Sequence, residues 1–96
     1  MLAQMRIYTI NRGEMDAFLK HFTEQTAPPH EQVGIPIVSM LVNRPQNEFI
    51  WVRTFESEDK LKVYENSPER AAYTPESGKH IAKIEVRTVE DGLVAG

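Results

Sequence analysis

Residues 49–55 read Phe-Ile-Trp-Val-Arg-Thr-Phe, a β-strand pattern in which both sets of alternating side chains are mostly apolar. One face of this predicted strand carries Phe49, Trp51, Arg53 and Phe55, and the other carries Ile50, Val52 and Thr54. An antiparallel sheet that has one face in water alternates apolar with polar residues instead. Both faces of the sheet that contains residues 49–55 must therefore be covered.

The preceding apolar segment, residues 35–42, shows the same two-faced pattern. Strict alternation predicts one face made of Ile35, Ile37 and Leu41, and another made of Val38, Met40 and Val42. Pro36 cannot donate a hydrogen bond to a neighbouring strand. This segment is therefore predicted to lie at an edge of the sheet.

A strand and a helix precede these two strands. The strand covers residues 5–10, and the helix after it has an apolar face made of Met15, Phe18, Leu19 and Phe22. Pro28-Pro29 is expected to end or kink this helix, because proline lacks the N–H group and clashes with the preceding turn. Gly34 suits a C-terminal helix cap.

A second helix and a last strand follow residues 49–55. Ser57 is predicted to cap the helix, with acidic residues in the first turn. Ser67-Pro68 and Thr74-Pro75 each read as an N-cap followed by a first helical residue, so we expect a new helical segment at each pair. The last strand is predicted over residues 84–89, and we expect residues 91–96 to form a tail that is frayed or docked on a neighbouring molecule.

The order strand, helix, strand, strand, helix, strand predicts one α+β domain, residues 1–96, with a ferredoxin-like βαββαβ fold. Right-handed crossovers place both helices on one face of a four-stranded antiparallel sheet. A two-fold copy of the chain is the commonest cover for the other face. A handful of large apolar side chains buried there would contribute on the order of 10 kcal/mol, comparable with an association cost of about 4–15 kcal/mol. We therefore expect a homodimer that pairs through the sheet face.

The composition excludes several classes of partner. Eleven Lys and Arg against fourteen Asp and Glu give a net charge of −3, with no basic cluster of the kind that binds nucleic acid or an anionic membrane. The chain has no cysteine, its three histidines lack a metal-binding spacing, and no nucleotide-binding glycine motif is present. We expect no metal and no cofactor. The N-terminal residues lack the apolar run of a signal peptide, so a cytoplasmic location is expected.

Four stretches together resemble the NIPSNAP family of the dimeric α/β-barrel superfamily, over about residues 6–89. They are residues 49–55, the run Gly13, Asp16, Ala17, Phe18 and Leu19, the segment His30-Glu31-Gln32-Val33-Gly34, and the segment Tyr64-Glu65-Asn66-Ser67-Pro68. The resemblance implies a ferredoxin-like subunit and a homodimer that forms a dimeric α/β barrel. Most of the family has no assigned reaction, and relatives in the superfamily include cofactor-free monooxygenases, isomerases and haem-binding enzymes.

The chain also departs from the bacterial pattern of that family. The family often has a tryptophan where Arg70 stands and a histidine where Tyr73 stands. Chemistry that depends on that histidine is therefore not implied for this chain.

Arg53 is the most informative candidate site residue, because it is a charged residue on a largely apolar strand face. A buried charge needs a partner. One interpretation is a structural ion pair with Glu85 or with a glutamate of a partner subunit. The other is a clamp that binds the carboxylate or enolate of a ligand.

The candidate catalytic residues are Arg53, Tyr73 and His21. Tyr73 or His21 would act as general acid or base, and Arg53 would stabilise a developing anion. The candidate ligand-binding residues are Tyr8, Tyr64, Trp51 and His30. Tyrosines serve equally well as core residues with a polar tip, and a histidine at a helix boundary is usually half-buried.

Three functions remain open on the sequence alone. The first is a homodimer that binds a small apolar or carboxylate-bearing molecule between sheet and helices. The second is a cofactor-independent enzyme of the monooxygenase or isomerase type. The third is a non-catalytic scaffold that binds a partner protein.

Overall fold

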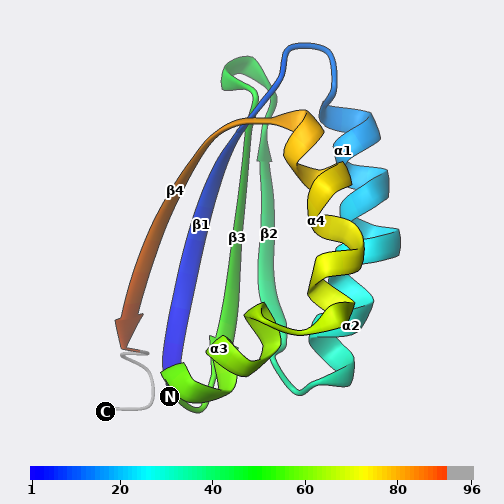
Figure 1. Cartoon of the computed structure of the whole chain (residues 1–96). Helices are drawn as coiled ribbons and strands as arrows, with labels where there is room; N and C mark the ends of the chain where they lie inside the picture. Colours follow the sequence, from blue (N-terminus) through cyan, green and yellow to red (C-terminus); the bar gives the residue numbers. More distant parts are fainter. Residues whose placement is uncertain (91–96) are drawn as a thin grey trace.

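A four-stranded antiparallel sheet with all helices on one face forms the described part of the chain, residues 1–90 (Figure 1). The strand order is β2-β3-β1-β4. The predicted tail at residues 91–96 lies outside the described residues of this computed structural model. The elements in chain order are β1 (Leu2–Ile10), α1 (Met15–His21), η1 (Phe22–Thr26), α2 (Ala27–Gln32), β2 (Ile37–Asn43), η2 (Arg44–Gln46), β3 (Glu48–Phe55), α3 (Glu58–Glu65), α4 (Pro68–His80) and β4 (Ile81–Glu90).

This arrangement confirms the α+β, ferredoxin-like fold class and the edge position of the strand that follows Pro36. Strands β1 and β4 each begin three residues before the predicted start. None of the helices within residues 1–90 has the combined length and apolar character that a membrane crossing requires.

The first crossover is one long helix in three parts, α1, η1 and α2. The helix does not end at Pro28-Pro29, which was one of the two predicted outcomes, because it continues to Gln32. Two consecutive prolines remove two hydrogen-bond donors, and the turn before them widens into the π-helix η1, in which Ala27 N–H donates to Phe22 O. The prolines then occupy the first turn of α2, where no intrahelical donor is needed. Gly34, with φ of 74°, provides the predicted C-terminal cap.

The second crossover consists of α3 and α4, which begin at two serine caps. Ser57 accepts a hydrogen bond from Lys60 N and Ser67 accepts one from Arg70 N, as predicted. The predicted restart at Thr74-Pro75 is wrong, because α4 continues through Pro75. Thr74 bonds back to its own helix through Oγ1, which donates to Arg70 O at 2.7 Å, rather than capping a new one.

A β-bulge in β2 changes which side chains share a face. The register of β2 against β3 shifts between Ile37 and Ser39. After the shift, Leu41 pairs with Ile50 on the sheet face away from the helices, while Met40 pairs with Trp51 on the helix side. The prediction that Ile37 and Leu41 share a face is therefore wrong, because a bulge inserts one unpaired residue into the alternation.

The buried side chains form two clusters between the sheet and the helices. The larger one consists of Tyr8, Ile10, Met15, Phe18, Phe22, Phe49 and Trp51, and the smaller one of Ile35, Phe55, Leu61, Tyr64 and Tyr73. The opposite sheet face carries the exposed side chains Met5, Leu41 and Val89 and the partly exposed side chains Ile7, Ile50 and Val52. Both sheet faces are thus rich in apolar residues, as the sequence predicts.

Candidate functional site

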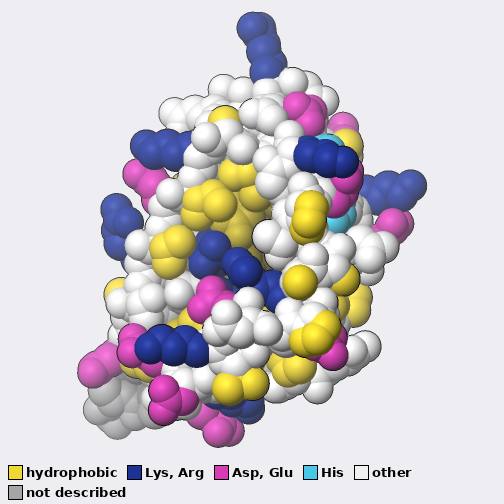
Figure 2. All heavy atoms as spheres, in the orientation of Figure 1, with side chains coloured by type: hydrophobic (Ala, Val, Ile, Leu, Met, Phe, Trp, Pro, Cys, Tyr) yellow, Lys and Arg dark blue, Asp and Glu magenta, His cyan; other side chains and the backbone are white. Residues whose placement is uncertain are grey.

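A cavity of about 100 Å³ lies between the helix side of the sheet and the helical layer. Residues of β1, β3, β4, α1, η1 and α4 line it. Figure 2 shows the hollow, in which apolar side chains adjoin a group of Lys and Arg side chains. The cavity therefore has an apolar part and a cationic part.

Aromatic rings make up most of the apolar part. Phe18 packs edge-on against Tyr8 and Phe49, with centroid distances of 5.9 and 5.2 Å, and Phe22 packs edge-on against Trp51 at 5.0 Å. These rings come from β1, α1, η1 and the inward face of β3, on which alternate residues are aromatic. Together they form a rigid wall for the apolar body of a ligand.

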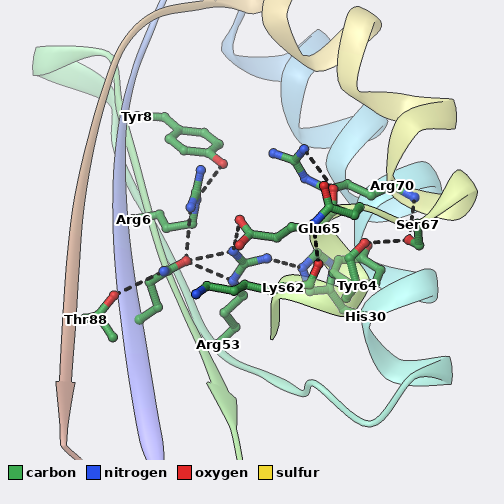
Figure 3. Close-up of polar contacts among 12 residues, drawn as sticks. Arg6, Tyr8, His30, Arg53, Lys62, Tyr64, Glu65, Ser67, Arg70 and Thr88 are labelled. Carbon is green, nitrogen blue, oxygen red and sulfur yellow. Dashed lines mark hydrogen bonds and ion pairs between the residues drawn. The ribbon is translucent and has the colours of Figure 1, made fainter. Parts of the chain in front are cut away.

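Three arginines make up the cationic part: Arg6 from β1, Arg53 from β3 and Arg70 from α4 (Figure 3). Arg6 lies over the rings of Tyr8 and Trp51, with its guanidinium carbon 5.6 and 5.8 Å from their centroids. The guanidinium of Arg53 lies 5.3 Å from the Trp51 ring. Each contact has cation–π geometry, which holds the charges against an aromatic surface.

Arg53 is 3% exposed and is held by groups from three elements. Its Nε and Nη2 donate to Gln4 Oε1 at 3.1 and 2.7 Å, its Nη1 donates to His30 Nε2 at 2.9 Å, and its Nη2 lies 3.4 Å from Glu65 Oε2. Burial lowers the pKa of Arg53, and the charge of Arg6 lowers it further. The hydrogen bonds to Gln4 and His30 therefore fix the orientation of the guanidinium, although its contact with the Glu65 carboxylate is long.

The predicted ion pair of Arg53 with Glu85 is wrong. Glu85 pairs in register with Ile7 on the sheet face away from the helices, and its carboxylate lies 3.4 Å from Lys83. Arg53 points to the helix side, where Glu65 of α3 is its carboxylate partner. The two side chains are therefore separated by the sheet.

His30 is neutral and holds the Arg53 guanidinium through a hydrogen bond. Its Nδ1 lies 2.8 Å from Thr26 O, a carbonyl that can only accept, so Nδ1 carries the proton and Nε2 accepts from Arg53. Burial lowers the pKa of His30 to about 4, and the charge of Arg53 contributes to this shift. This histidine fixes the orientation of Arg53 without adding charge to the site.

Tyr64 and Tyr73 form a hydroxyl pair beside His30. Their oxygens are 2.6 Å apart, and Tyr64 Oη lies 3.3 Å from His30 Nδ1. Burial raises the pKa of Tyr73 well above its usual range, and the hydrogen bond with Tyr64 raises it further. Tyr73 reaches the cavity as a neutral hydroxyl, which disfavours its predicted role as a general base.

His21 lies in a separate hollow between α1, η1 and α4. Its Nε2 is 2.7 Å from Ser77 Oγ, and burial lowers its pKa. Of the three candidate catalytic residues, the structure brings Arg53 and Tyr73 to one cavity and leaves His21 outside it. Of the four candidate ligand-binding residues, Tyr8 and Trp51 line the cavity, while Tyr64 and His30 support Arg53 and Tyr73 from behind.

Sequence reasoning did not find Arg6, Gln4, Thr26 or the cationic role of Arg70. The signal for the first two was the alternation Gln4, Arg6, Tyr8 on one face of β1, where polar residues enter an otherwise buried strand face. Gln4 is 7% exposed and sits directly opposite Arg53 in the β1–β3 register. A buried glutamine beside a buried arginine satisfies hydrogen-bonding groups that burial would otherwise leave without partners.

Comparison with known proteins supports the fold. No protein-family model and no curated protein matches the sequence. Among solved structures, an uncharacterized NIPSNAP domain protein from Burkholderia xenovorans superposes with a TM-score of 0.83 at 18% identity, covering 95% of this chain and 94% of that chain. A NIPSNAP family protein from Agrobacterium tumefaciens gives 0.80 at 20% identity, covering 93% and 90%.

An antibiotic biosynthesis monooxygenase also superposes, with a TM-score of 0.77 at 14% identity, covering 95% of this chain and 98% of that chain. At these identities the likeness is one of fold. The chain has the ferredoxin-like α+β fold of NIPSNAP family proteins over nearly its full length, as the resemblance of residues 6–89 implies.

Proposed function

We propose that the protein is a homodimer that binds a small amphipathic anion in the cavity between sheet and helices. The observation that carries this proposal is the group of three arginines at one part of an otherwise aromatic cavity. A carboxylate or a similar acid group would bind the guanidiniums, and an apolar body would pack against Phe18, Phe22 and Trp51. Concave apolar surfaces with a few convergent polar groups are the usual small-molecule sites.

Binding is better supported than proton-transfer catalysis. The ionisable side chains among the described lining residues are arginines and tyrosines, and burial raises the pKa of one of them, Tyr73. General acid–base catalysis works best with a group whose pKa lies near the operating pH. Guanidiniums, in contrast, are permanently charged donors whose planar geometry matches that of carboxylates.

The first prediction concerns charge selectivity. Trp51 is the only tryptophan of the chain and lines the cavity, so its fluorescence reports on occupancy. We expect hexanoate to change the emission with at least tenfold higher affinity than hexanol, because only the acid can pair with the arginines. Replacing Arg70 with glutamine is expected to weaken hexanoate binding about tenfold. The protein should still fold, since within residues 1–90 the Arg70 guanidinium makes a single hydrogen bond, to Glu65 O at 3.4 Å.

The matched control is Arg12→Gln, which removes the same charge from an exposed turn. This variant should bind hexanoate as the original chain does. Equal affinities for hexanoate and hexanol would contradict the proposal, because the site would then not recognise the charge of the acid. Equal weakening by the two substitutions would also contradict it, because binding would then depend only on the net charge of the protein.

The homodimer is proposed from the sheet face that the helices leave uncovered. Exposed fractions of 58% for Leu41, 52% for Val89 and 40% for Met5 leave large apolar side chains in water on this face. On β4 the same face carries Lys83, Glu85 and Arg87, charges of alternating sign. A self-complementary contact across a two-fold axis would bury the apolar residues and pair opposite charges.

The second prediction tests this dimer. We expect a mass of about twice 11.0 kDa in light scattering at micromolar concentration, and a monomer for Leu41→Lys, because a buried lysine opposite its own copy costs several kcal/mol. The control is Val63→Lys, a substitution of an exposed apolar residue on α3, at 74% exposure. The control variant should remain dimeric. A monomeric original chain, or a dimeric Leu41→Lys variant, would refute pairing through this face.

A further inference from the structure

The charges around the cationic part of the cavity do not balance. Within the described residues, the three lining arginines have one carboxylate partner, Glu65, at 3.4 Å from Arg53. Neither Arg6 nor Arg70 lies within ion-pairing distance of a described carboxylate. The site therefore carries an excess of about two positive charges.

Gln4 occupies a position at which a carboxylate would neutralise one of these two charges. Its Oε1 accepts from Arg6 Nη1 at 3.0 Å and from Arg53 Nε and Nη2 at 3.1 and 2.7 Å, while its Nε2 donates to Thr88 Oγ1 at 3.2 Å. One neutral amide oxygen thus joins two guanidiniums. A glutamate of the same size would make the same contacts with Arg6 and Arg53 and add a negative charge.

Donors remain available for a ligand on the cavity side. Arg6 uses Nε and Nη1 for Tyr8 and Gln4, and no described residue accepts from its Nη2. Arg70 makes its single side-chain hydrogen bond to a described residue at 3.4 Å. Both guanidiniums line the cavity together with Arg53, so an anion placed between them meets several donors at once.

We infer that the acid group recognised by this site carries two negative charges, and that Gln4 keeps the protein from supplying one of them itself. This inference rests on the proposed anion-binding function and narrows it to phosphate monoesters or dicarboxylates with a small apolar body. A monoanion would leave one guanidinium charge uncompensated in a partly desolvated cavity, whereas a dianion neutralises both.

The test compares ligands of one shape and different charge by calorimetry at pH 8, where a phosphate monoester is a dianion. Phenyl phosphate and phenyl sulfate have the same tetrahedral headgroup but differ by one charge, and benzyl alcohol is the neutral reference. We expect phenyl phosphate to bind at least tenfold more tightly than phenyl sulfate. Benzylmalonate, a dianion, and phenylacetate, a monoanion, form a second pair. The pair with the larger ratio of dianion affinity to monoanion affinity identifies the headgroup as phosphate or dicarboxylate.

The protein side of the test is Gln4→Glu, which places the missing charge inside the site. We expect this variant to melt at a higher temperature than the original chain without ligand and to bind phenyl phosphate at least tenfold more weakly. Gln32→Glu, at an exposed position of α2, adds the same charge outside the cavity and should change neither property.

The outcomes separate the two proposals. Equal affinities for phenyl phosphate and phenyl sulfate, both above that of benzyl alcohol, would overturn the inference that the ligand is a dianion. The proposal that the site binds an anion would still stand. Affinities no higher than that of benzyl alcohol would overturn both. Unchanged phenyl phosphate binding by Gln4→Glu would also overturn the inference, because the charge at Gln4 would then not compete with the ligand.

Discussion

Replacing Phe18 with alanine is expected to lower the free energy of unfolding by about 3–5 kcal/mol, the range for truncating a buried phenylalanine. Phe18 is 1% exposed and contacts four other rings, with centroid distances of 5.9 Å to Tyr8, 6.0 Å to Phe22, 5.2 Å to Phe49 and 6.3 Å to His80. Removing the ring loses its burial and leaves a void that these rigid neighbours fill only in part. Urea denaturation at pH 7 measures the loss.

The control for this prediction is Val63→Ala, which truncates an apolar side chain with 74% exposure. It should change the free energy of unfolding by less than about 0.5 kcal/mol, as surface substitutions usually do. A loss of less than about 1 kcal/mol for Phe18→Ala would mean that the aromatic wall of the cavity can collapse. The wall would then not hold the shape that the proposed ligand requires.

Acid is expected to destabilise the protein through His30. Burial lowers its pKa to about 4 in the folded chain from the ordinary value of 6.5, which the residue regains on unfolding, so the unfolded chain binds the proton more readily. The stability that the neutral His30 contributes is complete above pH 6.5 and is lost as the pH falls from 6.5 to 4. At about 1.4 kcal/mol per pH unit the loss reaches about 3 kcal/mol.

The physical reason lies in the groups that surround the ring. Protonated His30 would present two N–H donors, one of them toward the guanidinium of Arg53 at 2.9 Å. Arg6 and Arg70 add further positive charge nearby, and the side chain is 1% exposed. A charged imidazole would therefore lose its hydrogen bond with Arg53 and face like charges in a desolvated position.

Urea denaturation between pH 7 and pH 4 tests this prediction, together with an NMR titration of the His30 ring. Carboxylates titrate in the lower part of the same window, so the comparison is with His30→Gln, whose amide oxygen can still accept from Arg53 but does not titrate. We expect the variant to lose about 3 kcal/mol less than the original chain over this range. Parallel pH profiles for the two proteins would show that His30 is not the titrating group.

Much of the fold follows from local pattern. The alternation in residues 49–55, the proline before the edge strand and the serines at positions 57 and 67 each act within a few residues. The structure confirms the strand, the edge position and the two helix starts that they predict. The β2 bulge and the π-helix η1 were missed because each is one extra residue in an otherwise regular element. The neighbouring strand or helix decides whether such a residue is accommodated.

The candidate site was predictable only in its aromatic and most buried members. Trp51 and Arg53 stand out from the sequence, because a strand that is apolar on both faces makes a charged residue conspicuous. The partners of Arg53 depend on register, which places Gln4 opposite it and sends Glu85 to the other face. The cationic role of Arg70 was missed, since nothing local in the sequence shows that α4 places it at the cavity.

The π-helix η1 has a consequence for how chain length affects the cavity. The buried residues Phe18, Phe22, Thr26 and His30 are four positions apart, a spacing that drifts about 40° per step around a regular α-helix. The wider turn holds about one more residue and cancels much of this drift, so the same side of the helix faces the sheet throughout. Deleting one residue between Phe22 and Thr26 would return this turn to a regular α-helix and keep the His30 ring facing Arg53, whereas the same deletion in α2 before His30 would swing the ring by about 100°.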